Sequence, residues 1–493
     1  MTYDEAIAAF GSGERQSLVE PLGQAVRAAS ADPRILHLHG LVLRDLGRRA
    51  EALPSLRKAA GLAPQSVKIA VALARTLFEA GLPSVEAYGR ALALAPGDTD
   101  ILSGLTGAFV VDGEPDTAIA GLERIVARSP QWLSGHVLLA KLRWAQGERA
   151  GFDRSFEAAT AAIPANVDLW REWIIALIHA EDFDRVFEVI AKGRAAIGEQ
   201  PVFAANEAIA AAETGDSERA ERLFEPFAAL EDSTVQVRRV RHYIRTGRPE
   251  LADRIIGQWT DQPDGFMFWP YASIAWRMLG DPRWQWLEGD DRFVGVYDIA
   301  DRLPPIDQLT ETLRNLHTLK GQPLEQSLRG GTQTDGNLLT RIDPVIVKLR
   351  EAIQSTVEEH ASRFPEHEVR HPLLGPQRGP IHFAGSWSVR LQGGGFHANH
   401  VHPAGWISSA LYVALPPDLG QDEAGFLTLG DASSPTLQID TPPFRTVEPK
   451  PGRLALFPSY MWHGTRPFGE GERLTVAFDV AVPGRFNRGQ MRI

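Results

Sequence analysis

A repeat of about 34 residues punctuates the first 290 residues of this 493-residue chain. It is marked by glycines at positions 13, 47, 81, 113, 147, 215 and 247. The spacings are 34, 34, 32, 34, 68 and 32 residues, and Glu181 stands in the middle of the long one. Prolines at 33, 64, 96, 130 and 164 keep the same phase. Two sets of breaker residues at one period predict an array of similar units, each burying its apolar face against the next.

Within each unit the apolar residues recur at helical spacing, as in "ILHLHGLVLRDLGRRAEALPSLRKAAGLAP". Each glycine therefore lies between two helices. The units resemble tetratricopeptide repeats, and "GRRAEALPSLRKAAGLAP" and "GEPDTAIAGLERIVARSP" show the pattern best. The resemblance implies a helical repeat domain over residues 1–290 with seven or eight stacked helix pairs. An irregular helical bundle is the alternative that the spacing leaves open.

The pattern changes in the last 200 residues. A helical stretch to about residue 320 precedes the polar, glycine-rich "PLEQSLRGGTQTDGN", so we expect residues 291–340 to form a connecting helix and loop. An amphipathic helix follows in "DPVIVKLREAIQSTVEEHASRF", with Asp343 as its N-cap and Pro344 in its first turn. The helix opens a last domain that we place at residues 341–493.

Beyond that helix the chain reads as short strands. They are "HFAGSWSVRLQ", "ISSALYVALP", "GFLTLG", "RLALFP" and "RLTVAFDVAV", which are separated by Gly, Pro and Asp. Short strands at this spacing predict a sandwich or barrel such as a jelly roll. The expected fold class is thus multidomain α + β: an N-terminal α-solenoid followed by a double-stranded β-helix domain. We expect the two halves to have separate cores and to be separable.

The amino-acid composition limits the classes of function and the kinds of metal site that the chain could have. The chain has 62 acidic and 51 basic residues, a net charge of −11, which disfavours non-specific binding to nucleic acid or anionic membranes. The opening residues lack a signal-peptide pattern and no apolar run approaches the roughly 20 residues of a membrane span, so we expect a cytoplasmic protein. There is no cysteine, which excludes disulfides, thiolate nucleophiles and iron–sulfur clusters. Any metal must be held by His, Asp, Glu or similar ligands.

The stretch "GGGFHANHVHP" places His397, His400 and His402 within six residues. His400 and His402 are two apart and would project to the same side of an extended chain. His463 lies 61 residues after His402, behind the predicted strand "GRLALFP". A ferrous site needs two or three ligands on one face, with other positions left open. This order of histidines therefore predicts a metal site.

Arg473 and Thr475 begin the strand "RLTVAFDV", ten and twelve residues after His463, and share one strand face. The planar fork of an arginine is suited to a carboxylate, with a hydroxyl beside it. Arg473 alone could equally be a paired surface charge, and Thr475 a strand residue without a role.

These features resemble the iron and 2-oxoglutarate dependent oxygenase superfamily, most closely bacterial members with N-terminal tetratricopeptide repeats. The segments that carry the likeness are "QSLRGGTQT", "GSWSVRL", "HANHVHPAGWISSALYVALP", "PKPGRLALFPSYMWHG" and "ERLTVAFDV". The resemblance implies Fe(II), 2-oxoglutarate and O2 as cofactor and co-substrates. It implies that His400 and His463 bind iron and that Arg473 with Thr475 binds 2-oxoglutarate.

His402 departs from the family pattern, because it stands where a carboxylate ligand is expected. It could be a third ligand, a residue that supports the ligands, or a substrate contact. The pair His397 and Asn399 is an alternative start of the site, although Asn is a poor iron ligand. Arg390 in "SWSVR" is either an exposed strand charge or a contact to substrate or co-substrate.

Three functions remain open at this stage. The leading one is a 2-oxoglutarate-dependent hydroxylase acting on a protein or peptide substrate recruited by the repeats. A cupin-type metal enzyme is the second, because Gly394 is followed after five residues by His400 and His402, but Trp406 or Ile407 stands where that pattern needs a glutamate. The third is a non-catalytic repeat scaffold with a relic barrel. The sequence does not set the oligomeric state.

Overall fold

The computed structural model describes residues 3–12, 15–29, 32–433 and 437–484. Helices fill the chain up to Glu288, and strands dominate from Gly295 onward. The helices of the first part are α1 (Tyr3–Ser12), α2 (Arg15–Ala29), α3 (Pro33–Asp45), α4 (Arg49–Leu62), α5 (Val67–Glu79), α6 (Val85–Leu94), α7 (Thr99–Val111), α8 (Pro115–Arg128), α9 (Leu133–Ala145), α10 (Arg154–Ala162), α11 (Val167–His179), α12 (Phe183–Ile197), α13 (Pro201–Thr214), α14 (Ser217–Phe224), α15 (Ser233–Arg245), α16 (Pro249–Trp259), α17 (Trp269–Leu279) and α18 (Arg283–Glu288).

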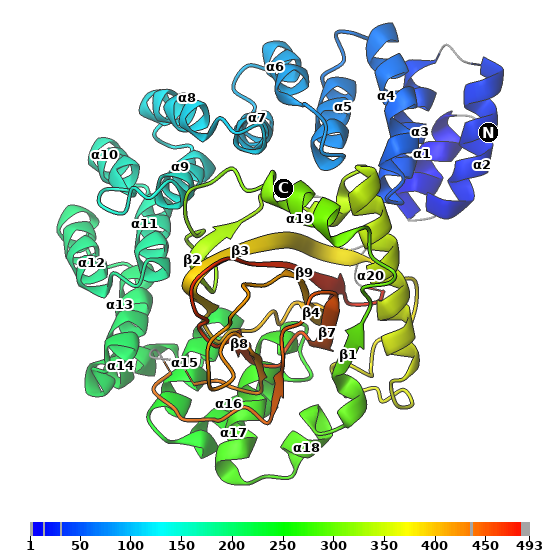
Figure 1. Ribbon diagram of the computed structural model, residues 1–493. Helices are drawn as coiled ribbons and strands as arrows, with labels where there is room; N and C mark the ends of the chain where they lie inside the picture. Colours follow the sequence, from blue (N-terminus) through cyan, green and yellow to red (C-terminus); the bar gives the residue numbers. More distant parts are fainter. Residues whose placement is uncertain (1–2, 13–14, 30–31, 434–436, 485–493) are drawn as a thin grey trace.

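The predicted repeats are confirmed as a curved array of antiparallel helix pairs (Figure 1). The turn inside each pair uses a left-handed backbone conformation, which glycine adopts without strain. Gly47, Gly81 and Gly113 have φ of 78°, 71° and 81°, and Glu181 takes the same position in its unit with φ of 57°. The interrupted glycine series is therefore one continuous repeat. Gly13, the first of the series, lies outside the described residues.

The strand-rich part contains two antiparallel sheets. The larger has the order β1-β7-β4-β9-β3-β2, and the smaller has the order β6-β5-β8. Their strands are β1 (Gly295–Asp298), β2 (Leu328–Gln333), β3 (Phe383–His397), β4 (Gly405–Ala414), β5 (Leu427–Leu429), β6 (Arg445–Val447), β7 (Arg453–Pro458), β8 (His463–Thr465) and β9 (Arg473–Ala481). The five predicted strands are confirmed as β3, β4, β5, β7 and β9, and the fold is an α + β multidomain chain.

Helices α19 (Ile306–Arg314) and α20 (Pro344–Ser362) cover the outer face of the larger sheet. Helix α20 is the amphipathic helix expected from the sequence. Its N-cap residue Asp343 makes no capping hydrogen bond, and its carboxylate instead accepts from Arg341 at 3.0 Å. The inner face of the sheet meets the smaller sheet through an apolar cluster that includes Leu427, Leu429 and Phe457.

Residues 291–340 are more than the expected connector. They supply β1, which pairs with β7, and β2, which pairs with β3, at the two edges of the larger sheet. The polar, glycine-rich sequence of β2 suits an edge strand with an irregularity, and the register shifts between Arg329 and Gly331. This shift occurs at Gly330, whose φ is 77°. The first strand of the larger sheet therefore begins at Gly295.

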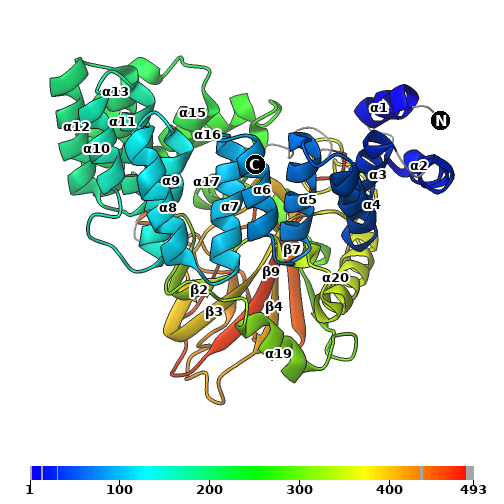
Figure 2. The same cartoon turned by 90° about the horizontal axis from the view of Figure 1, so that it is seen from above.

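The helix pairs wrap around the C-terminal domain, and Figure 2 shows them side by side along it. The segment between α19 and α20 crosses the turns of successive repeats. Thr340 Oγ1 donates to the Glu79 carbonyl at 2.8 Å, Thr318 Oγ1 donates to the Val110 carbonyl at 2.8 Å, and the Gly321 amide donates to the Ala145 carbonyl at 2.8 Å. These hydrogen bonds attach the segment between α19 and α20 to the turns of the repeats.

The expectation of two separate cores is wrong at the last repeats. One apolar cluster runs without interruption from Val240 on α15 and Phe268 before α17, through Leu349 on α20, to Leu411 and Phe478 of the larger sheet. Helices of the array and the sandwich therefore exclude water from a shared interior. None of the helices in the described ranges is long and apolar enough to cross a membrane.

Candidate metal centre

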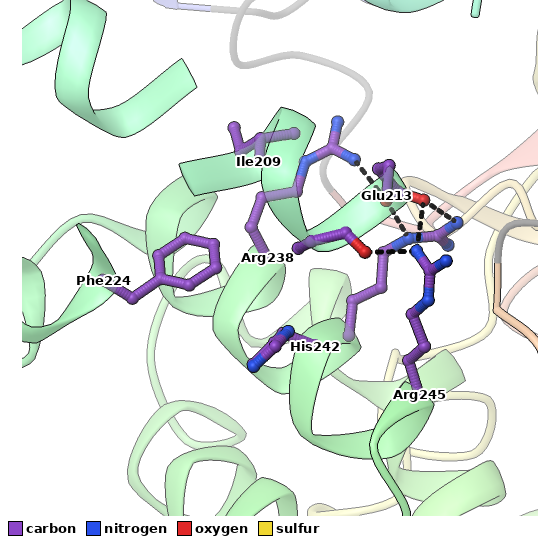
Figure 3. Close-up of a pocket in the computed structure, with 8 residues that line it drawn as sticks. Ile209, Glu213, Phe224, Arg238, His242 and Arg245 are labelled. Carbon is purple, nitrogen blue, oxygen red and sulfur yellow. Dashed lines mark hydrogen bonds and ion pairs between the residues drawn. The ribbon is translucent and has the colours of Figure 1, made fainter. Parts of the chain in front are cut away.

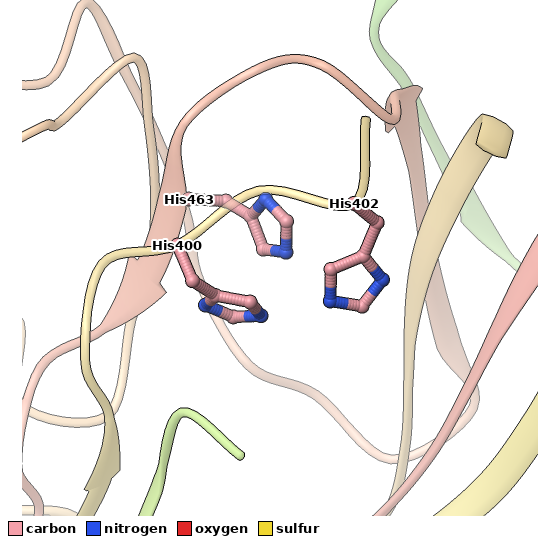
Figure 4. A group of neighbouring side chains, drawn as sticks. All are labelled: His400, His402 and His463. Atoms are coloured by element: carbon pink, nitrogen blue, oxygen red, sulfur yellow. The ribbon is translucent and has the colours of Figure 1, made fainter. Parts of the chain in front are cut away.

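His400, His402 and His463 come together where the two sheets meet. His400 lies just after β3, and His463 is the first residue of β8; their backbones form a β-bridge, with N–O distances of 2.9 and 3.0 Å. The His402 amide donates to the Ser459 carbonyl at 2.9 Å, which holds this residue beside the same segment. One potential ligand atom from each ring lies within 4.8 Å of the others, and Figure 4 shows the three rings turned toward one another.

The outer nitrogen of each ring has an acceptor. His400 Nδ1 lies 2.8 Å from the Ala398 carbonyl, His463 Nδ1 lies 2.8 Å from the Met461 carbonyl, and His402 Nδ1 lies 2.7 Å from an Asp479 carboxylate oxygen. Carbonyl and carboxylate oxygens only accept, so Nδ1 carries a proton in each ring, and in a neutral ring Nε2 keeps its lone pair. Metal-binding histidines are held in this way.

Burial sets the charge of the rings. It lowers the pKa of His463 to about 3, and burial together with the neighbouring imidazoles lowers the pKa of His400 well below its ordinary value. At neutral pH these two rings are therefore neutral, as a ligand must be. Burial disfavours charge on His402 as well, but the Asp479 carboxylate outweighs it and raises the pKa of His402.

Asp479 is a functional candidate that sequence reasoning missed. Its carboxylate accepts from His402 and also from Ser408 Oγ at 2.5 Å. It lies on β9 and shares a face with Arg473 and Thr475, because these residues alternate along the strand. The two-residue alternation in "RLTVAFDV" was the signal that could have placed it beside the histidines.

Arg473 is buried on the inner face of β9, with 1% of its surface exposed. Its Nη1 donates to the Gly425 carbonyl at 2.9 Å and its Nη2 donates to Thr465 Oγ1 at 3.0 Å. The Nε atom has no partner, and no carboxylate of the described residues pairs with this guanidinium. Burial accordingly lowers the pKa of Arg473. An unpaired buried cation is costly and points to an anion that completes it.

Thr475 and Tyr412 lie next to this guanidinium. They are direct partners in the register of β9 and β4, and both are buried. The Tyr412 hydroxyl has no hydrogen-bond partner among the described residues. The arginine carbon Cζ lies 5.9 Å from the Tyr412 ring centre. The buried Arg473 guanidinium and the Tyr412 hydroxyl, which has no partner among the described residues, thus lie close together on the inner face of the larger sheet.

Arg390 is not brought to this site. It lies opposite Leu474 in the register of β3 and β9, so its side chain leaves the sheet on the face away from Arg473. There its guanidinium pairs with Glu472, which also pairs with Arg314. The nearness of Arg390 to the histidines in sequence was misleading, because neighbouring residues of a strand point to opposite faces.

Of the residues in the alternative site patterns, His397 lies beside the cluster, with its ring stacked on that of His400 at 6.0 Å between centres. Ser327 Oγ contacts both rings, at 3.2 Å from His400 Nε2. His397 Nδ1 lies 3.1 Å from Ser327 Oγ, and Asn399 Nδ2 donates to the Ser433 carbonyl at 2.7 Å. Trp406 and Ile407, which occupy the glutamate positions of the cupin pattern, are both buried in the apolar core. A carboxylate ligand could not be supplied from either position.

Family models match both halves of the chain. One described as "Putative 2OG-Fe(II) oxygenase" matches residues 385–479, and a tetratricopeptide repeat model matches residues 201–226. The first span contains the three histidines, Arg473, Thr475 and Asp479. The second corresponds to α13 and α14. No curated protein matches the chain.

Solved structures show only distant likeness. A tetratricopeptide repeat protein from Parabacteroides merdae ATCC 43184 is 16% identical, with 48% of this chain and 94% of that chain covered and a TM-score of 0.31. A prolyl-4-hydroxylase from Pseudomonas putida is 18% identical, with 39% and 94% covered and a TM-score of 0.26. The MamA protein is 21% identical, with 32% and 87% covered and a TM-score of 0.29. The strand-rich part is thus similar to a putative 2OG-Fe(II) oxygenase domain, and the helix pairs before it include a match to a tetratricopeptide repeat.

Proposed function

We propose that the chain is an Fe(II)- and 2-oxoglutarate-dependent oxygenase that hydroxylates a protein or peptide substrate. The observation that carries this proposal is the pairing of two features within one sandwich. Three histidines bring ring nitrogens within 4.8 Å of one another, and the Nδ1 of each ring has an oxygen acceptor. On the same inner surface, a guanidinium is buried without a carboxylate partner among the described residues.

His400, His402 and His463 would hold the ferrous ion. Imidazole nitrogens suit iron, and the hydrogen bonds at Nδ1 fix the tautomer and orientation that a ligand needs. Of the three roles left open for His402, the metal-ligand role fits best, because its ring joins the cluster while Asp479 holds its far side. Asp479 then supplies a carboxylate that contacts His402, instead of a carboxylate at position 402 that contacts the metal.

Arg473 would receive the distal carboxylate of 2-oxoglutarate, with Thr475 and Tyr412 as hydroxyl partners. A guanidinium fork offers parallel donors that match a carboxylate. The Nε of Arg473 and the Tyr412 hydroxyl are donors that nothing else among the described residues uses. A dicarboxylate of this kind would therefore satisfy groups that are otherwise left unsatisfied in a dry interior.

The chain's own contribution is to position and to exclude water. When bound, iron with 2-oxoglutarate and O2 supplies a reaction in which 2-oxoglutarate and O2 become succinate and CO2 while one oxygen atom enters a C–H bond of the substrate. The apolar side chains of Val389, Leu391 and Phe457 are fully buried next to the proposed site and shield it. Asp479 keeps His402 oriented and raises its basicity.

A protein or peptide substrate is supported by the architecture. Helical repeat arrays use their extended inner surface for binding peptides and proteins. Here the array curves around the oxygenase domain (Figure 1), so a peptide bound to the array would lie near that domain.

Release of succinate from 2-oxoglutarate tests the proposed chemistry. We expect release to require ferrous ion and to be lost in His463→Ala. A cupin-type enzyme or a relic barrel would release no succinate while remaining folded. For the substrate, a lysate treated with the enzyme and 2-oxoglutarate should contain peptides whose mass has increased by one oxygen atom, and these should be absent when the His463→Ala protein is used.

A further inference from the structure

Three arginines form one face of α15, close to the oxygenase domain. Arg238, Arg241 and Arg245 are three and four residues apart and so lie along one side of the helix. All three approach Glu213 near the end of α13 (Figure 3). The nitrogen–oxygen distances to its carboxylate are 3.9 Å from Arg238, 2.6 Å from Arg241 and 3.6 Å from Arg245. A single buried carboxylate thus faces three guanidinium groups.

Arg238 is the least satisfied member of this arginine cluster. Its 3.9 Å ion pair is the longest of the three, and among the described residues it makes no hydrogen bond through its side chain. Arg241 has Tyr271 as a further partner, and Arg245 donates to the Ala212 carbonyl. Burial and the adjacent Arg241 charge lower the pKa of Arg238, yet 35% of its side chain remains accessible. The cluster therefore sets three guanidinium groups against one carboxylate, and Arg238, the most distant from that carboxylate, remains partly accessible.

The arginine cluster is linked to the candidate metal centre by two aromatic side chains. Tyr271, the partner of Arg241, lies on α17, and its ring centre is 5.9 Å from that of Trp462. Trp462 precedes His463, and its indole nitrogen donates to the Pro270 carbonyl at 2.9 Å. The side chains of Tyr271 and Trp462 thus lie between the arginine cluster and His463, a proposed iron ligand.

The same helix also holds the chain beside the site. Arg277 on α17 donates to the carbonyls of Gly430 and Pro442, at the two ends of the β5–β6 connection. Within that connection the Ser433 carbonyl accepts from Asn399, the neighbour of His400. Helix α17 therefore contacts the β5–β6 connection, and this connection in turn contacts the residue next to His400.

We propose that Arg238, supported by Arg241 and Arg245, binds an acidic segment of the peptide substrate while the target residue lies at the metal centre. The binding of an acidic peptide rests on the arginine cluster alone, whereas the identification of that peptide as the substrate rests on the proposed function. Charge complementarity selects the occupant, because a carboxylate would balance the surplus of positive charge. The recess between the arginines, Ile209 and Phe224 has a volume of about 10 Å³. That is room for about one water-sized group, so a carboxylate oxygen fits and a nucleobase does not.

Binding of a model acidic peptide tests this surface without the oxygenase chemistry. The probe is fluorescein-labelled hexaglutamate, titrated with the full-length protein at low ionic strength and followed by fluorescence anisotropy, with neither metal nor 2-oxoglutarate present. Loss of one charged hydrogen-bond partner is expected to weaken binding about tenfold in Arg238→Gln. Arg238→Lys, which keeps the charge, should recover part of the affinity. Arg254→Gln on α16 removes an exposed arginine and should bind as wild type does.

Several results would overturn the proposal. The first is that wild-type protein binds hexaglutamate no better than hexaglutamine. The second is that Arg238→Gln and Arg254→Gln bind hexaglutamate with equal affinity. The third is that the wild-type protein binds a single-stranded oligonucleotide more tightly than hexaglutamate. Thermal unfolding of each variant shows whether a loss of binding reflects loss of fold, and Arg238→Lys then decides the question. Absence of succinate release would refute the oxygenase function and leave this binding result standing.

Discussion

Replacing Arg473 by Met separates a binding role of this guanidinium from a structural one. The side chain is 1% exposed, makes two hydrogen bonds and has no ion pair with the described residues. Met keeps an unbranched apolar side chain and has no charge. The two lost hydrogen bonds cost about 1 kcal/mol each, whereas removing an unpaired buried cation returns several kcal/mol. We therefore expect the melting temperature of Arg473→Met without co-substrate to stay within a few degrees of wild type or to rise.

The affinity for 2-oxoglutarate should respond in the opposite way. Without the guanidinium, the distal carboxylate of 2-oxoglutarate would be buried with no cation, which costs about 3–5 kcal/mol. At about 1.4 kcal/mol per factor of ten, the dissociation constant should rise by at least ~100-fold. Arg473→Lys keeps the charge and loses the fork, so its affinity should lie between those of Met and wild type.

Calorimetric titration of 2-oxoglutarate into the manganese-loaded proteins measures these affinities, and elemental analysis measures metal content. Arg390→Met is the matched control, because Arg390 leaves the same sheet on its other face. We expect metal content to be equal in all four proteins and only the Arg473 variants to lose affinity. A dissociation constant in Arg473→Met within twofold of wild type would refute the assignment of the anchor. A large fall in melting temperature would show that the arginine has a structural role.

Three further predictions concern the metal, the pH dependence and the domain boundary. His402→Ala and His463→Ala should each weaken Mn²⁺ binding by at least ~10-fold; unchanged metal binding with lost turnover in His402→Ala would give this residue a substrate role instead. Burial raises the pKa of Glu288 to about 7, so the folded state favours the protonated acid and loses stability as pH rises from about 4.5 to above 7. Glu288→Gln should match wild type in urea unfolding at pH 4.5 and exceed it at pH 8 by about 3 kcal/mol; equal stability at both pH values would contradict this. A fragment of residues 290–493 exposes the core that it shares with α15–α17 and should aggregate, whereas a soluble fragment with a cooperative melting transition would show that the sandwich folds alone.

The repeat array could be predicted because its signals are local. A glycine in a left-handed turn and a proline near a helix start act through their own backbones, so their spacing reports the fold directly. Glu181 breaks the glycine series but not the fold, since its backbone still takes the left-handed conformation. Five strands could also be predicted, because they are longer or more apolar than the others; they are β3, β4, β5, β7 and β9.

The remaining parts depend on partners distant in sequence. The edge strands β1 and β2 lie in polar or short segments, and their pairing with β7 and β3 defines them as strands. The histidines could be found as a motif, and alternation along β9 puts Asp479 on the same face as Arg473. Its contact with His402, however, depends on β9 running beside β4 and β3. The shared core was hidden for the same reason, because its residues on α15 and in the sheet are more than 150 positions apart.

Conversion of 2-oxoglutarate to succinate tests the central claim most directly. The full-length protein, loaded with Fe(II) under anaerobic conditions, is mixed at stoichiometric concentration with 2-oxoglutarate and then with O2, and succinate is quantified by proton NMR. Stoichiometric amounts make even one slow turnover visible without the natural substrate. We predict succinate in the ferrous wild-type protein and none in the metal-free protein or in His463→Ala. Unchanged 2-oxoglutarate in wild-type protein that demonstrably holds one equivalent of Fe(II) would contradict the account.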